Sequence, residues 1–205
     1  MESLHRDDEK RTLRRFLRRQ RQALSEHEQR LAAQRLCHQL KALPEIRRAK
    51  RVSLYLPVNG EIDPTPLIGW LRKRRVEVYL PVLRPFSANV LWFVAYHRDT
   101  PMVRNRFNIW EPDMRFSAQR QNRLPAWALD TLIVPLVGYD ANANRMGMGG
   151  GFYDRSLAFM HRPGPSPNLI GVAHACQQVA SLPVEPWDVP LTAVVSDQGC
   201  VRRTR

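Results

Sequence analysis

The stretch Leu132-Ile-Val-Pro135, which continues as Leu-Val-Gly-Tyr-Asp140 and then Ala-Asn-Ala-Asn-Arg-Met-Gly-Met-Gly-Gly-Gly-Phe-Tyr-Asp-Arg155, decides the fold class. It begins with a nearly continuous apolar run, which is typical of a strand buried on both faces of a parallel sheet. A turn follows in which four of the five positions from 147 to 151 are glycine. A helix from about Phe152 to Met160 is expected next. A buried strand, a glycine-rich turn and a helix in this order predict an α/β sheet.

Strands and helices alternate on both sides of this stretch. Further strands are predicted at Val52–Leu56, Val76–Leu80, Val90–Tyr96, Leu169–Ala173 and Ala193–Ser196. Helices are predicted over 10–24, from the capping box of Ser25 and Glu28 to Pro44, and after Pro64. In the first helix Leu13, Phe16, Leu17 and Leu24 are expected to share the buried face, with the arginines pointing elsewhere.

The domain prediction follows from the absence of any internal repeat or low-complexity linker in the sequence. Residues 101–125 are rich in proline and are expected to be irregular. We predict one domain over residues 1–205, with a mainly parallel twisted sheet, helices on both faces and the site at the carboxyl ends of the strands.

Composition restricts the class of protein. The hydrophobic fraction of 43% can supply a core, and no apolar run approaches the roughly 20 residues that span a membrane. The N-terminus lacks the apolar segment of a secretory signal. The three cysteines, Cys37, Cys176 and Cys200, are too scattered for a disulfide framework or a zinc site. A cytoplasmic protein is predicted.

The formal net charge of +13 permits two interpretations. It could attract a polyanionic partner such as RNA, or a substrate that carries phosphates and carboxylates. Only four of the 32 basic residues are lysine, and such a skew also fits a genome-wide codon bias. Aromatic stacking motifs of the kind found in RNA recognition motifs are missing, so nucleic-acid binding is not expected as the main function.

The glycine-rich turn is a candidate anion site, since free backbone N–H groups before a helix bind phosphate. A flexible turn with unusual dihedral angles is the alternative. Asp154 beside the turn could hold Mg²⁺ next to bound phosphate, or it could be a favourable acid in the first turn of a helix. Arg155 could balance phosphate charge or pair with Asp154.

Several motifs together resemble the 5-formyltetrahydrofolate cyclo-ligase family. The signature of that family is matched by Arg145-Met-Gly-Met-Gly-Gly-Gly-Phe-Tyr-Asp154. In chain order, the other matching segments are Lys10–Arg14, Gly60–Asp63, Asn108–Pro112, Leu132–Asp140, Gln177–Pro183 and Glu185–Asp188. The resemblance extends from about residue 10 to residue 197. It implies a fold like that of NagB, RpiA and the CoA transferases.

The resemblance implies ATP- and Mg²⁺-dependent closure of 5-formyltetrahydrofolate, in its free or polyglutamylated form, to 5,10-methenyltetrahydrofolate with release of ADP and phosphate. It implies an ATP site formed by Lys10, Arg14, Arg145, Met146, Gly147, Met148, Gly149, Gly150, Gly151, Phe152 and Tyr153. It implies a folate site formed by Leu56, Glu61, Phe107, Met148, Gly149, Gly150, Gly151 and Phe152. It further implies that Arg145 and Tyr153 are catalytic and that Asp154 and Asp188 hold Mg²⁺.

Three alternatives remain for single residues. Lys10 and Arg14 could form a solvated basic face, Phe107 could be a core residue, and Asp188 could cap a turn. A different ATP- or phosphosugar-using α/β enzyme would share the glycine turn, but the context of Glu61 argues against it.

The chain departs from the family pattern at Met148 and Gly150, where some relatives carry basic residues. A positive charge near the γ-phosphate would then come from Lys10, Arg14 or Arg145. Thr192 stands where some relatives have aspartate, which weakens the assignment of a second metal ligand.

Overall fold

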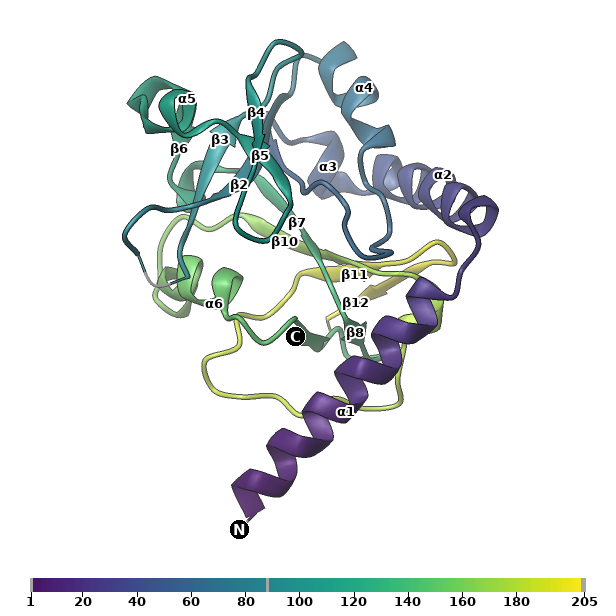
Figure 1. The fold of residues 1–205 in the computed structure, drawn as a ribbon. Coiled ribbons are helices and arrows are strands. Elements are labelled where there is room, and N and C mark those ends of the chain that lie inside the picture. Colours follow the sequence, from purple (N-terminus) through teal and green to yellow (C-terminus); the bar gives the residue numbers. More distant parts are fainter. Residues whose placement is uncertain (1, 88, 204–205) are drawn as a thin grey trace.

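The computed structural model of the protein describes residues 2–87 and 89–203 and has an eight-stranded sheet at its centre (Figure 1). The strands of this sheet are β1 (Arg51–Ser53), β2 (Glu77–Leu83), β3 (Leu91–Ala95), β6 (Arg123–Leu124), β7 (Thr131–Pro135), β10 (Asn168–Val172), β11 (Ala193–Val195) and β12 (Cys200–Arg202). Their order is β12-β11-β10-β7-β1-β2-β3-β6. The strands from β11 to β2 in this order pair in parallel, and β12, β3 and β6 add antiparallel pairs at the edges. The mainly parallel sheet predicted from the sequence is confirmed.

Helices and two small hairpins surround the sheet. The helices are α1 (Glu2–Gln22), α2 (Glu26–Ala42), α3 (Pro44–Arg47), α4 (Pro66–Lys73), α5 (Met114–Ala118) and α6 (Phe152–Ser156), with 3-10 turns η1 (Arg120–Asn122), η2 (Ala126–Ala128), η3 (Ala158–His161) and η4 (Ala175–Gln177). The hairpins pair β4 (Met102–Arg104) with β5 (Trp110–Pro112), and β8 (Gly138–Tyr139) with β9 (Arg145–Met146).

Alternating side chains of the strands divide the core into two layers. In β7, Ile133 packs in the cluster that contains residues of α2, α3 and α4, whereas Leu132 and Val134 pack in the cluster on the other face. Leu157, which follows α6, belongs to this second cluster. Helices therefore cover both faces, as predicted, with α2, α3 and α4 on one face and α6 on the other (Figure 1).

Prolines mark two of the helix boundaries. The second helix ends before Pro44, as predicted, with Ala42 as its last residue, and Pro44 begins α3 because proline suits the first turn of a helix. The next helix begins at Pro66 rather than near Pro64 for the same reason. The capping box of Ser25 and Glu28 is confirmed.

Other predicted elements are shorter or missing. The strand that begins near Val52 ends at Ser53, and the helix expected over 152–160 divides into α6 and η3. Residues 101–125 are not irregular, because they form β4, β5, α5 and β6. The strand at 193–196 is not the last, since β12 follows it.

The buried face of α1 differs from the predicted one. Leu17 is 1% exposed, as expected, but Phe16 is 55% exposed. Arg21, which was expected to point away, is 1% exposed. The inward face of α1 packs on the β8–β9 hairpin through Leu17, which contacts Val137 and Met146. One turn further along the helix, Arg21 lies on the same face and is buried against backbone carbonyl groups.

Gly138 lets α1 approach this hairpin closely. A Cβ at Gly138 would lie 2.5 Å from Cδ1 of Leu17. We expect Gly138→Ala to lower the free energy of unfolding by about 1–3 kcal/mol, because overpacking displaces a buried side chain. Urea denaturation checks this, with Gly199→Ala as the control, since a Cβ there meets nothing within 4 Å. Equal midpoints for the two variants would show that Leu17 adjusts freely.

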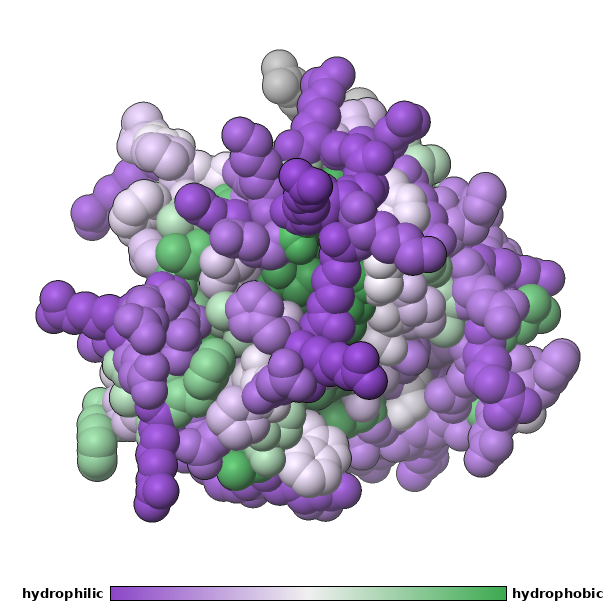
Figure 2. Space-filling view, turned by 90° about the horizontal axis from the view of Figure 1, so that it is seen from above, coloured by the Kyte–Doolittle hydropathy of each residue, from purple (hydrophilic) through white to green (hydrophobic). Residues whose placement is uncertain are grey.

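The surface is largely hydrophilic on the face drawn in Figure 2, where hydrophobic side chains are visible only in small areas between polar ones. Among the helices in the described part of the chain, none combines the length and the apolar character that crossing a membrane requires.

Candidate functional site

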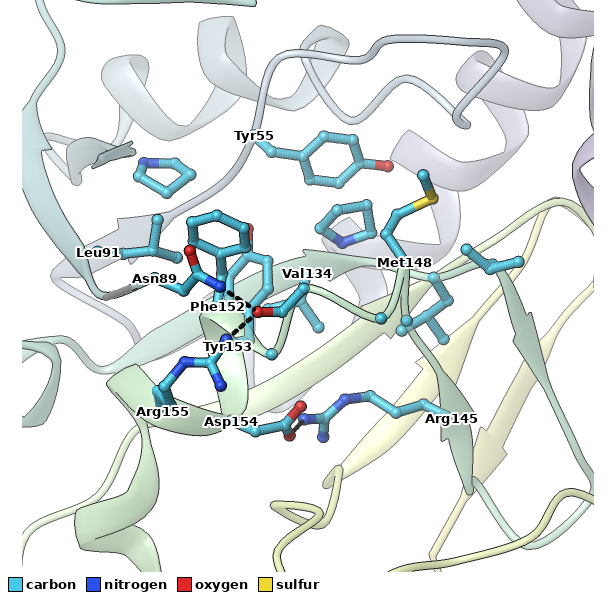
Figure 3. Close-up of a pocket in the computed structure, with 18 of the residues that line it drawn as sticks. Tyr55, Asn89, Leu91, Val134, Arg145, Met148, Phe152, Tyr153, Asp154 and Arg155 are labelled. Atoms are coloured by element: carbon cyan, nitrogen blue, oxygen red, sulfur yellow. Dashed lines mark hydrogen bonds and ion pairs between the residues drawn. The ribbon is translucent and has the colours of Figure 1, made fainter. Parts of the chain in front are cut away.

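A cavity of about 1800 Å³ opens at the carboxyl ends of β1, β2 and β7. The glycine-rich turn between β9 and α6 and the residues after β1 contribute to its wall, as does α1 (Figure 3). All residues predicted for ATP, folate or Mg²⁺ line it: Lys10, Arg14, Leu56, Glu61, Phe107, Arg145, Met146, Gly147, Met148, Gly149, Gly150, Gly151, Phe152, Tyr153, Asp154 and Asp188. The fold therefore brings together residues from segments far apart in the chain.

The glycine-rich turn has the backbone geometry that its sequence suggests. Gly149 and Gly151 have φ angles of +88° and +64°, a region that side chains other than glycine rarely occupy. The carbonyl of Gly150 accepts hydrogen bonds from Nδ2 of Asn89, at 2.9 Å, and from the guanidinium of Arg155 (Figure 3). Nε of Arg14 donates to the carbonyl of Gly147 at 3.0 Å. The turn is thus fixed by side chains from three segments rather than freely flexible.

Arg145, not Arg155, pairs with Asp154. Its guanidinium donates to Oδ1 of Asp154 and to the carbonyl of Val189, and its side chain is only 9% exposed. Burial lowers the pKa of Arg145, and the charge of Asp154 opposes that change. Arginine keeps its charge in proteins, so the pair orients the Asp154 carboxylate at the edge of the glycine turn.

Asp154 and Asp188 are the acids whose position would suit a metal ion. Both influence Arg145 electrostatically, and the backbone N–H of Val189 lies 3.4 Å from Oδ1 of Asp154. Asp188 also accepts from the backbone N–H of Glu185 at 2.9 Å, which is the turn-capping contact considered as its alternative role.

The oxygen ligands in this part of the cavity suit Mg²⁺ better than an ion that is held by protein side chains alone. Within residues 2–87 and 89–203, no group of three or more His, Cys, Asp or Glu side chains is arranged to hold a metal. Mg²⁺ usually binds through one or two carboxylates together with substrate phosphates and water. Asp154 and Asp188, which both line the cavity together with the glycine turn, fit this mode of binding.

Lys10 and Arg14 do not belong to the solvated face of α1. Nζ of Lys10 pairs with Oε1 of Glu185, and the two side chains are 14% and 20% exposed. Arg14 contacts the glycine turn. Both cations line the cavity, as the prediction for an ATP site requires.

Glu61 lies in the part of the cavity formed by the residues after β1. Its side chain is 9% exposed, and Oε2 accepts from the backbone N–H of Val58 at 3.1 Å. Burial raises the pKa of Glu61, and the nearby charge of Arg21 opposes the rise. Leu56 lines the same cavity.

Tyr153 is a neutral hydrogen-bond donor in this environment. Burial is the largest cause that raises the pKa of its hydroxyl, and the negative charge of Glu61 adds to the effect. A phenol with a raised pKa keeps its proton and can donate to an oxygen that gains negative charge.

Phe107 is a cavity residue rather than a core residue. It is 52% exposed, and its ring meets that of Phe152 edge to face with 6.0 Å between the centroids. Asn105 holds the backbone N–H of Phe107 at 2.9 Å and also donates to Glu111. The β4–β5 hairpin therefore presents an aromatic ring opposite the glycine turn.

Some functional neighbours were not found from the sequence. Arg21 behind Glu61, Asn89 on Gly150 and Glu185 on Lys10 all act across long separations in the chain. For Arg155 the sequence left two roles open, balancing phosphate charge or pairing with Asp154. In the structure it donates to the carbonyl of Gly150, and Asp154 pairs with Arg145. The place of Arg155 next to the signature was the available signal.

Comparisons of the whole chain with known proteins identify its family. The sequence model of the 5-formyltetrahydrofolate cyclo-ligase family matches residues 6–197. The chain is 46% identical over 169 residues to the 5-formyltetrahydrofolate cyclo-ligase of Haemophilus influenzae, covering 82% of this chain and 86% of the relative. It is 42% identical over 181 residues to that of Escherichia coli K12, covering 88% and 96%.

Two solved structures with a similar fold are both named as 5,10-methenyltetrahydrofolate synthetases. The NMR structure of Aquifex aeolicus 5,10-methenyltetrahydrofolate synthetase superposes with a TM-score of 0.76 at 31% identity, covering 94% of this chain and 92% of that one. The Mycoplasma pneumoniae 5,10-methenyltetrahydrofolate synthetase superposes with a TM-score of 0.70 at 25% identity, covering 92% and 98%. The chain belongs to the 5-formyltetrahydrofolate cyclo-ligase family.

Proposed function

We propose that this enzyme uses ATP and Mg²⁺ to close 5-formyltetrahydrofolate to 5,10-methenyltetrahydrofolate, releasing ADP and phosphate. The observation that carries the proposal is the single cavity lined by all predicted ATP and folate residues. Its volume of about 1800 Å³ exceeds the roughly 300–1000 Å³ of a pocket for one ligand. A nucleotide and a folate could therefore bind side by side.

The nucleotide would bind at the glycine turn. Backbone N–H groups of residues 147–151 would face its phosphates, with Lys10, Arg14 and Arg145 supplying positive charge. Asp154, with Asp188 nearby, would hold Mg²⁺, which neutralises charge on phosphate oxygens when bound.

The folate would bind between Glu61 and the aromatic pair. Adjacent N–H donors of a pterin ring suit a carboxylate that accepts from both. Phe107 and Phe152 provide apolar surface beside it, and Leu56 lines the same space.

The chemistry needs positioning more than covalent work by the protein. The formyl oxygen is a poor leaving group, so N10 cannot close the ring directly. Transfer of the γ-phosphoryl group from ATP to that oxygen makes a phosphate ester of the formyl carbon. N10 then attacks the carbon and loses its proton, and the C–O bond breaks to release phosphate and leave the methenyl bridge. In-line geometry and charge neutralisation drive such a transfer. The Tyr153 hydroxyl would donate to oxygens that gain charge, and Arg145 would hold Asp154 in place.

The remaining assignments belong to the same proposal. We take residues 1–205 as one domain in the cytoplasm, acting on free or polyglutamylated folate, with no nucleic-acid partner. Product formation tests the central assignment. The methenyl chromophore should appear only when ATP, Mg²⁺ and 5-formyltetrahydrofolate are all present, and its appearance without ATP would contradict the proposal.

Arg155 would supply the cation that the family pattern places at positions 148 or 150. Its guanidinium lies against the turn, where a Cβ on Gly151 would be 2.8 Å from it. We expect Arg155→Met to raise the KM for ATP about tenfold, because a charge-assisted contact to phosphate is lost. Initial rates at varied ATP concentration measure this.

A lysine at position 148 can replace the positive charge of Arg155 within the site. Met148 is 52% exposed and lines the cavity. A double variant, Met148→Lys with Arg155→Met, should recover most of the affinity for ATP. Arg162→Met, an exposed site past η3, is the control. An unchanged KM in Arg155→Met would leave Arg155 with a purely structural role at the turn.

A further inference from the structure

Arg21 is the largest side chain that is fully buried in the described part of the chain, with 1% of its surface exposed. Burying a guanidinium is costly unless its charge and donors are matched. Burial accordingly lowers the pKa of Arg21, and the charge of Glu61 is the largest influence that opposes this. Because the burial of Arg21 is costly, a specific structural role is expected, and its contacts indicate which one.

The guanidinium joins three segments of the cavity wall. Nε donates to the carbonyl of Asn59 at 3.1 Å, and one terminal nitrogen donates to the carbonyl of Leu136 at 3.3 Å. The other terminal nitrogen lies 3.7 Å from Oε1 of Glu61. Helix α1 is thereby linked to the segment after β1 and to the end of β7.

The turn before Glu61 is shaped around this arginine. Asn59 and Gly60 have φ angles of +52° and +74°, and a Cβ on Gly60 would lie 3.1 Å from the backbone oxygen of Arg21. The close approach of turn and helix leaves little freedom in the direction that Glu61 can point. Its other oxygen is fixed by the N–H of Val58 at 3.1 Å.

Charged and titratable groups from several elements act on Glu61 or on its neighbours. Arg18, Arg21, Tyr55 and Tyr153 interact with Glu61, Asp63 acts on Tyr55, and His174 contacts the carbonyl of Gly60. Burial raises the pKa of Glu61, and Arg21 is the first of the groups that lower it, ahead of the N–H of Val58 and of Arg18. Tyr55 and Tyr153 keep their protons because burial raises the pKa of each hydroxyl.

We infer that Arg21 is a positioning residue that keeps Glu61 ionised and directed into the cavity for binding of the pterin ring. The inference rests on the proposed function of Glu61. A protonated Glu61 would present a hydroxyl to the N–H donors of the pterin and lose one acceptor. Burial already raises the pKa of Glu61, and removal of the Arg21 charge should raise it further, which shifts the loss of binding to higher pH.

The test compares Arg21→Gln with the wild-type enzyme at two levels. First, the carboxyl resonance of Glu61, identified with ¹³C-labelled glutamate by its loss in Glu61→Gln, is titrated without any ligand. It should titrate at higher pH in Arg21→Gln. Second, the Kd for 5-formyltetrahydrofolate is measured over the pH range in which Glu61 titrates. In Arg21→Gln the affinity should fall about tenfold per pH unit below the new pKa and recover towards the wild-type value above it.

Arg19→Gln is the matched control, since it removes the same charge from the exposed side of the same helical turn. It should leave both titrations at their wild-type positions. If Arg21→Gln does not fold, citrulline at position 21 carries the test, because it keeps the shape and most donors without the charge. Native Cys37 permits ligation of a synthetic segment of residues 1–36 to the remainder of the chain.

Three outcomes are distinct. A Glu61 resonance that titrates at the same pH with and without the Arg21 charge would overturn the inference, as would a loss of affinity that is equal at every pH. A wild-type enzyme that binds no 5-formyltetrahydrofolate would instead contradict the proposed function, whereas the titration without ligand would still measure the effect of Arg21 on Glu61.

Discussion

Replacing Glu61 with glutamine is expected to lower kcat/KM for 5-formyltetrahydrofolate by about 100-fold or more. Hydrogen bonds to a charged group contribute about 1.5–3 kcal/mol each, and the substitution removes the charge behind two of them. The amide also turns an N–H group towards a pterin edge that is itself a donor, which leaves both donors unsatisfied in a buried place. Because the proposed ATP site consists of the glycine turn with Lys10, Arg14 and Arg145 and does not include Glu61, the Kd for ATP should change much less than the Kd for the folate.

Steady-state kinetics with both substrates and nucleotide binding by calorimetry check this result. Glu77→Gln is the control, because Glu77 lies at the start of β2 and is outside the cavity lining. A Glu61→Gln enzyme with wild-type affinity for the folate would show that the ring binds elsewhere in the cavity. A parallel loss of ATP affinity would point to a collapse of the site.

Asp154→Asn should lower kcat about 1000-fold at a Mg²⁺ concentration that saturates the wild-type enzyme. Asparagine can still accept the hydrogen bond from Arg145, so the ion-pair geometry is preserved while the negative charge is lost. Mg²⁺ dehydrates reluctantly and depends on carboxylate charge for its place beside phosphate. Turnover should therefore need more Mg²⁺, while the affinity for the folate stays close to that of the wild type.

The measurement is kcat as a function of Mg²⁺ concentration, with thermal unfolding to confirm that the variant is folded. Asp113→Asn, at the N-cap of α5, is the comparison for a general effect of removing an aspartate. If Asp154→Asn retained the wild-type dependence on Mg²⁺, the metal would be held by other groups, and Asp188 would be the next to change.

Part of this site was predictable from the sequence, because its backbone conformation requires glycine at particular positions. Gly149 and Gly151 adopt left-handed dihedral angles in the turn between β9 and α6, and a run of glycines predicts such a turn. Asp154 follows within three residues of Gly151, so its place beside the turn is fixed by short-range geometry. The parallel centre of the sheet was predictable because its apolar strands are buried on both faces.

Long-range contacts and short edge elements were not predictable in the same way. Arg21 is one of seven arginines in α1, and nothing in the helix itself shows which of them is buried. Its selection depends on Asn59 and Leu136, which fold back from other segments. The strands β6 and β12 have two and three residues, too few for a periodic pattern.

The fate of the formyl oxygen tests the account most directly. The enzyme would be given 5-formyltetrahydrofolate labelled with ¹⁸O in the formyl group, together with ATP and Mg²⁺, and the released phosphate would be analysed by mass spectrometry. Phosphoryl transfer to the formyl oxygen predicts one ¹⁸O atom in each phosphate formed with the methenyl product. Unlabelled phosphate, with the label released to water, would contradict activation of that oxygen and the mechanism built on this cavity.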